Sequence, residues 1–68
     1  MRYQKVSTIE QLESCMRNQI DVDVWFGGEI DLTSKILSFN EYSITFKEGI
    51  YLRNNIDLRA RGNYFLLI

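Results

Sequence analysis

The stretch VDVWFGGEIDLTSKILSF, residues 22–39, decides the fold of this chain. Its first five residues alternate: two valines and a phenylalanine have one parity, and Asp23 and Trp25 have the other. Alternation of this kind is typical of a half-buried strand. The Gly-Gly pair that follows supplies the positive φ angles of a tight hairpin turn. The stretch therefore predicts two antiparallel strands, with the side that carries Asp23 and Trp25 facing away from the core.

The second strand of this hairpin, residues 30–39, changes its parity. Ile30, Leu32 and Ile36 share the inner side of the strand. From Leu37 onward the apolar residues have the opposite parity. An extra residue in one strand produces such a switch, so the pattern predicts a β-bulge or a sharp bend. Small barrels need bends of this kind to curl the sheet.

A helix is predicted before the hairpin and three strands after it. Ile9, Leu12 and Cys15 recur at a spacing of three, which predicts a helix over residues 7–18. Ser7, with Glu10 three residues later, matches a capping box at its start. Further strands are expected at residues 42–47, 50–52 and 56–60, and an apolar run at 64–68 is either a sixth strand or part of an interface.

Length and composition place these elements in a single domain, residues 1–68. The predicted fold class is mainly β: an N-terminal helix followed by a small five-stranded, SH3-like barrel. A chain of this length buries only about 60% of the surface that its unfolded form exposes. One cysteine excludes an internal disulfide, and without histidine a zinc site is not expected. Oligomerisation is the remaining way to reinforce so small a core.

Composition also bears on location and partners. A lone cysteine favours a reducing compartment, and no apolar stretch approaches the ~20 residues that cross a bilayer, so we expect a cytoplasmic protein without membrane contact. The net charge of −1 gives no overall attraction to nucleic acid. Residues 1–34 carry three basic and six acidic side chains, whereas residues 35–68 carry five basic and three acidic ones. A local basic face is compatible with this asymmetry.

Catalysis and cofactors are not expected. Without histidine the chain has neither a Ser-His-Asp nor a Cys-His arrangement, and it has no phosphate-binding glycine loop. Asp21 and Asp23 lie two residues apart on one side of a strand, where they either share a metal ion or a proton or belong to a solvated polar face. Cys15 is interpreted as a small apolar core residue, with a reactive thiol as the alternative.

Four segments resemble the Sm-like family, and bacterial Hfq in particular: VDVWF (22–26), IDLTSKI (30–36), SFNEY (38–42) and LRNNI (52–56). The resemblance covers about residues 7 to 58. It implies an Sm-like barrel, a homo-oligomeric ring joined through edge strands, and single-stranded RNA as ligand. Asp31, where the family usually has a lysine, and Asn54, where it has a histidine, depart from the pattern.

The resemblance assigns three groups of RNA-binding residues: an adenine-stacking face, a uridine-holding pore and an outer rim. The adenine-stacking face consists of Trp25, Ile30, Leu32 and Thr33. The uridine-holding pore consists of Glu41, Tyr42, Arg53 and Asn54, and the rim residue is Arg17.

The residues leave two functions open. The first is an Hfq-like, ring-forming RNA-binding protein that regulates after transcription. The second is a small regulatory protein of bacterial or phage origin that docks on a partner protein. Its docking surface would be the acidic hairpin residues Asp21, Asp23, Glu29 and Asp31.

Two sets of side chains have alternative interpretations. Trp25 either stacks on a nucleobase, or packs beneath the helix or on a neighbouring subunit. Arginines of the last two strands either bind phosphate, or are solvated and pair with Glu48 or Asp57. These arginines are Arg53, Arg59 and Arg61.

Overall fold

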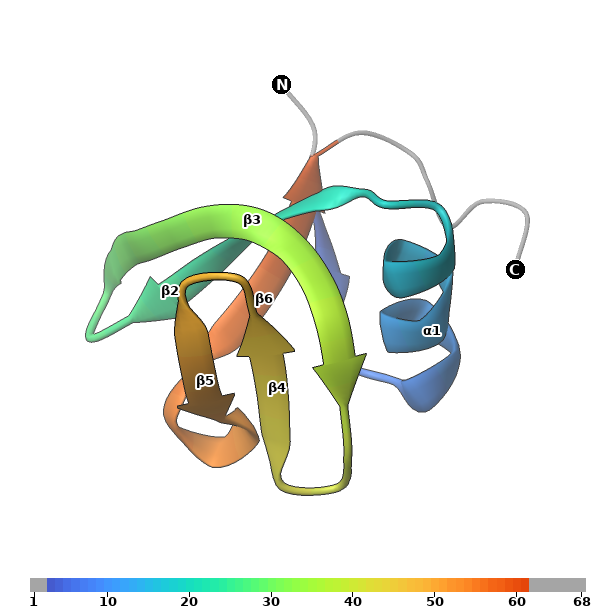
Figure 1. Ribbon diagram of the computed structural model, residues 1–68. Coiled ribbons are helices and arrows are strands. Elements are labelled where there is room, and N and C mark those ends of the chain that lie inside the picture. Colours follow the sequence, from blue (N-terminus) through green and yellow to red (C-terminus); the bar gives the residue numbers. More distant parts are fainter. Residues whose placement is uncertain (1–2, 62–68) are drawn as a thin grey trace.

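A computed structural model describes residues 3–61 and shows a mainly β protein (Figure 1). Its strands form one open antiparallel sheet in the order β1-β6-β2-β3-β4-β5, accompanied by one α-helix and one 3-10 turn. The elements are β1 (Tyr3–Val6), α1 (Ile9–Arg17), β2 (Asp21–Phe26), β3 (Glu29–Phe39), β4 (Ser43–Phe46), β5 (Gly49–Leu52), η1 (Arg53–Asn55) and β6 (Asp57–Arg61).

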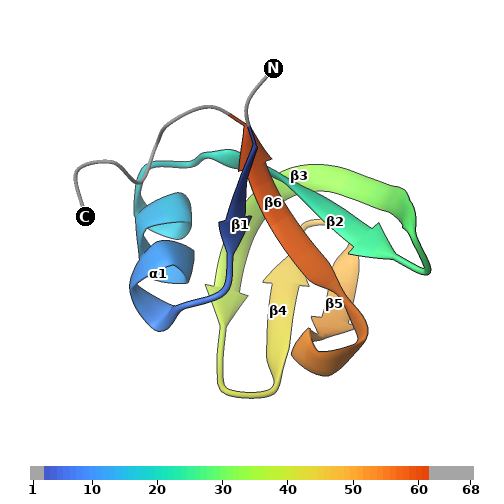
Figure 2. The same ribbon diagram turned by 180° about the vertical axis from the view of Figure 1, so that it is seen from behind.

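The described sheet has six strands, so the prediction of five was wrong. The additional strand is β1, which precedes the helix and pairs with β6 from Tyr3 opposite Arg61 to Val6 opposite Leu58 (Figure 2). The sequence did not reveal β1 because the strand is short and Val6 is its only buried residue. As a result β6 lies inside the sheet, and β1 and β5 are the edge strands. The apolar run at 64–68 lies outside the described residues.

The N-cap of helix α1 lies one residue later than the sequence predicted. Thr8, not Ser7, is the N-cap residue: its hydroxyl accepts from the Gln11 N–H at 3.1 Å, and the Gln11 side chain accepts from the Thr8 N–H at 3.2 Å. The capping box is therefore shifted by one residue from the predicted Ser7 and Glu10. No helix in the described part of the chain is long and apolar enough to cross a bilayer.

The two strands of the quoted hairpin form the centre of the fold. Val22 and Val24 of β2 are fully buried and lie in the core beside Leu12 and Cys15 of α1. Strand β3 arches from β2 to β4 (Figure 1), and its pairing with β4 shifts register between Ile36 and Ser38. This shift confirms the bend that the parity switch predicted.

Strand β5 exposes the two apolar residues whose spacing marked it in the sequence. Ile50 and Leu52 are 69% and 57% exposed. Tyr51 between them is partly buried against the core, and its ring meets that of Phe46 edge-on, with centroids 5.8 Å apart. The edge strand therefore presents its aliphatic side to solvent and its aromatic side to the core.

Candidate binding surfaces

Trp25 lies on the outer side of the sheet beneath a guanidinium group. Arg59 of β6 places its guanidinium carbon 4.3 Å from the centroid of the Trp25 ring. The indole is partly buried, and its Nε1 atom is buried with no hydrogen-bond partner among residues 3–61. A shallow pocket of about 340 Å³ adjoins it, lined also by Asn54, Asn55 and Asp57. Trp25 thus packs under Arg59, a contact that sequence reasoning did not anticipate.

The structure divides the predicted adenine-stacking face. Trp25 and Ile30 lie opposite each other in the β2–β3 ladder, as the resemblance implies. Val24 pairs with Leu32 and the next residue, Trp25, pairs with Ile30, so Asp31 of β3 is an extra residue at this point. This bulge places Ile30 and Leu32 on opposite sides of the sheet. Leu32 consequently packs against the core, whereas Ile30 is 43% exposed and does not share the inner side of β3 with it. The expectation that Ile30 and Leu32 point the same way was therefore wrong.

Most of the acidic hairpin residues already have partners within the fold. Asp21 accepts from Lys35 Nζ at 2.7 Å, and Asp31 accepts from the Tyr51 hydroxyl at 2.5 Å. That hydrogen bond is the main reason why the pKa of Tyr51 lies above its ordinary value of 10.0. Asp23, a further member of this acidic group, is buried and is not part of an exposed surface. No group of three potential metal ligands gathers within residues 3–61.

Asp23 contradicts the interpretation of a solvated Asp21–Asp23 face. It is 1% exposed, and its carboxylate accepts from the Thr33 hydroxyl at 2.7 Å. Asp23 also lies directly opposite Arg59 in the β2–β6 ladder. Asp23 thus lies between Thr33 of β3 and Arg59 of β6. The alternation of residues within β2 alone does not reveal this burial. Thr33, assigned to RNA by resemblance, is the residue that donates to this carboxylate.

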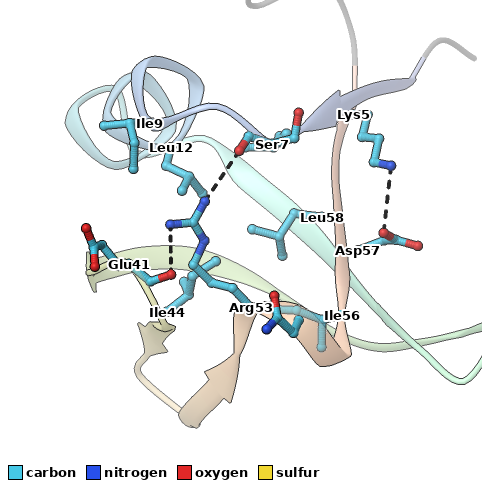
Figure 3. A pocket seen from close by; sticks show the side chains of 12 residues that line it. Lys5, Ser7, Ile9, Leu12, Glu41, Ile44, Arg53, Ile56, Asp57 and Leu58 are labelled. Atoms are coloured by element: carbon cyan, nitrogen blue, oxygen red, sulfur yellow. Dashed lines mark hydrogen bonds and ion pairs between the residues drawn. The ribbon is translucent and has the colours of Figure 1, made fainter.

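The predicted pore residues meet around the 3-10 turn η1. Arg53 donates from Nη1 to the carbonyl oxygens of Asn40 and Glu41, at 3.1 and 3.3 Å, and from Nη2 to that of Ser7 at 3.4 Å. Its main-chain N–H donates to the Tyr42 carbonyl at 2.8 Å. Arg53 therefore connects the β3–β4 turn to the segment before α1 (Figure 3). Tyr42 itself is 72% exposed.

A groove of about 500 Å³ lies beside Arg53, between α1, the β1–α1 connection and η1 (Figure 3). Its floor is apolar and consists of the buried side chains of Leu12, Ile44 and Leu58. Ile9, which is 46% exposed, stands at one side. The remaining walls are mostly polar and include Glu41, Asn54 and the ion pair of Lys5 with Asp57, 3.9 Å apart. The groove thus reaches down to core side chains that are themselves at most 3% exposed.

The basic side chains of the described residues are largely engaged within the protein. Arg17, predicted at the rim, pairs with Glu13 one helical turn away. Arg53 contacts main-chain carbonyls, and Arg59 covers Trp25. The Arg61 side chain is outside the described structure. Among described lysines and arginines, Lys47 alone shows no such contact.

Cys15 lies at the centre of the core, with no exposed surface. Burial raises the pKa of its thiol from 9.0 to about 11, because the charged thiolate loses its hydration. This environment agrees with a small apolar core residue and opposes a reactive thiol.

No protein-family model, curated protein or solved structure matches this chain. Sequence reasoning missed the groove, because its lining comes from five elements and three connections, and no short motif marks it. It did single out Glu41, Arg53 and Asn54, which the structure brings together at the groove wall.

Proposed function

We propose that this protein is a non-enzymatic binding module that docks on a partner protein, whose apolar side chain enters the groove beside Arg53. The observation that carries the proposal is a groove whose apolar floor of Leu12, Ile44 and Leu58 is surrounded by a mostly polar rim. Protein interfaces commonly place a buried apolar anchor in a pocket surrounded by polar contacts. The partner would therefore supply an aliphatic or aromatic anchor.

The use of the basic side chains supports a protein rather than a nucleic acid as partner. Phosphate contacts supply most of the affinity for nucleic acids, and they require lysine or arginine side chains free to make them. Most of the described cations already contact carboxylates, carbonyls or the Trp25 ring. The net charge of −1 adds no compensating attraction.

A pair of matched variants tests the groove. Ile9→Arg places a charge at its wall, and Leu37→Arg places the same charge at an apolar residue of β3 that is 59% exposed and lies away from the groove. Circular dichroism first establishes that both variants fold. Tagged wild type and Leu37→Arg should then recover the same defined protein from a bacterial lysate, and Ile9→Arg should lose it.

Equal recovery by all three proteins would show that the groove is not the docking site. Recovery of RNA without any specific protein would instead favour the second candidate below.

The second candidate is an Hfq-like RNA-binding ring with an Sm-like barrel. It is supported by the element order, in which α1, β2, β3, β4, β5, η1 and β6 follow one another as in the Sm-like fold that the sequence resembles. The Trp25–Arg59 stack would offer a surface for a base. Since β1 covers the outer edge of β6, a ring would have to join β5 of one subunit to β1 of the next.

Titration of Trp25 fluorescence with single-stranded oligoadenylate tests this candidate. Saturable quenching that weakens as salt rises from about 50 to 200 mM is expected for phosphate-dependent binding. The absence of quenching at low salt would reject the Trp25 site.

A further inference from the structure

The outer edge of β5, a strand of four residues, lacks the charge, proline and bulge by which proteins often protect an edge strand. Residues Gly49–Leu52 contain no charge and no proline, and their ladder with β4 runs without a register shift. The opposite edge, β1, carries the charged Lys5. Edge strands that lack such protection readily pair with another strand. Among the described residues, none pairs with the outer edge of β5.

The main-chain groups of Ile50 and Leu52 point toward this free edge. The Arg53 N–H donates to the Tyr42 carbonyl, and the ladder continues in the same register with Leu52 opposite Ser43. Hydrogen-bonded and non-hydrogen-bonded pairs alternate along an antiparallel ladder. Tyr51 therefore bonds to β4, whereas Ile50 and Leu52 direct their N–H and C=O groups outward.

The same two residues carry the exposed aliphatic side chains. Ile50 is 69% and Leu52 57% exposed, and both side chains lie on the outer face of the sheet. Main-chain hydrogen-bonding groups and apolar surface are thus presented together, which is what strand addition uses.

The edge is complementary to itself. In an antiparallel pair of two β5 strands centred on Tyr51, Ile50 of one copy lies opposite Leu52 of the other. This register brings the outward N–H and C=O groups together, and it places aliphatic side chains opposite each other on one face. The four residues of β5 carry no charge, so no two like charges oppose each other in this pairing.

We propose that a second copy of this chain pairs with the first through β5, giving a two-fold symmetric dimer with one continuous sheet. A two-fold interface uses the same patch on both subunits, and β5 in this register satisfies that condition. The dimer does not depend on the groove proposal, since Ile9 and the groove floor are not part of β5.

The mass of the full-length protein in solution tests the dimer. Light scattering over a wide concentration range should give twice the chain mass of 8.1 kDa. Ile50→Lys and Leu52→Lys should each weaken dimerisation about tenfold or more, whereas Leu37→Lys, at an exposed site outside β5, should leave it unchanged. In the dimer, hydrogen exchange should show protected amides at Ile50 and Leu52.

Three results would overturn the proposal. They are a monomer at every concentration, a larger ring mass, or a dimer that Ile50→Lys and Leu52→Lys leave intact. A monomer with protected amides at these residues would show that another segment of the same chain covers the edge.

Discussion

Arg59 holds its guanidinium carbon 4.3 Å from the centre of the Trp25 ring, across the neighbouring strands β6 and β2. The electron-rich ring face attracts the cation, and such pairs contribute about 0.5 to 2 kcal/mol depending on their burial. The contact explains how a large aromatic residue is accommodated on the outer side of a sheet. Arg59 thus serves as a lid on Trp25, and removing it exposes the indole.

The first prediction concerns this lid. Arg59→Ala should shift the emission maximum of Trp25 to longer wavelength, because water then reaches a ring face that the guanidinium covers. Trp25 is the chain's single tryptophan, so its emission is read directly. Lys35→Ala, which removes a cation of β3 paired with Asp21 of β2, should leave the maximum unchanged. An unshifted maximum in Arg59→Ala would mean that the stack does not persist in solution.

The second prediction concerns the buried carboxylate of Asp23. Thr33→Val removes the hydroxyl that donates to it, so it should lower the free energy of unfolding by about 1 to 3 kcal/mol. Thr33→Ser retains a hydroxyl donor and should lose much less. Urea titrations at neutral pH measure both values. Equal losses in the two variants would rule out the hydrogen bond as their cause.

The third prediction separates the two candidate caps of α1. Thr8→Ala should cost about 0.5 to 2 kcal/mol, because it removes the acceptor for the Gln11 N–H. Ser7→Ala should change stability by less than about 0.5 kcal/mol, since the Ser7 hydroxyl takes no part in the capping box. Thermal melts of the two variants provide the comparison. A larger loss of stability for Ser7→Ala than for Thr8→Ala would show that Ser7 is the N-cap residue.

The fourth prediction concerns Cys15 and pH. Its thiol should resist alkylation at pH 8 in the folded protein and react promptly in urea, because burial disfavours the thiolate. A pKa raised by folding favours the protonated thiol in the folded state. The corresponding stability is present below pH 9 and is lost as pH rises from 9 toward 11. Cys15→Ala should show a weaker decline over this range, and an identical decline would exclude Cys15 as its source.

Much of the fold could be predicted from local patterns. Alternation located the strands around Val22, Ile44 and Leu58, and the glycine pair located the hairpin turn, where Gly27 and Gly28 both have positive φ. The parity switch after Ile36 located the bend in β3. Each of these signals involves residues close in sequence, where backbone sterics and side-chain parity are decided.

The candidate surfaces could be predicted only in part. The Sm-like resemblance drew attention to Trp25, Arg53 and their neighbours, but it did not show that Arg59 covers the indole or that Arg53 contacts three carbonyls. The partners of a long cation depend on which strands lie adjacent. That adjacency comes from sheet order, which a strand pattern leaves open.

The sequence by itself determined where the helix, the central hairpin and the later strands form, and that the core is small. These properties depend on residues two to four positions apart. Only the tertiary structure decided that β1 covers β6, that Asp23 is buried and that a groove opens beside Arg53. Such features depend on contacts between distant segments, as when Arg53 reaches the Ser7 carbonyl across 46 positions of the chain. Contacts of that range depend on how the whole sheet curls and packs, because only the packed sheet brings together side chains that are far apart in sequence.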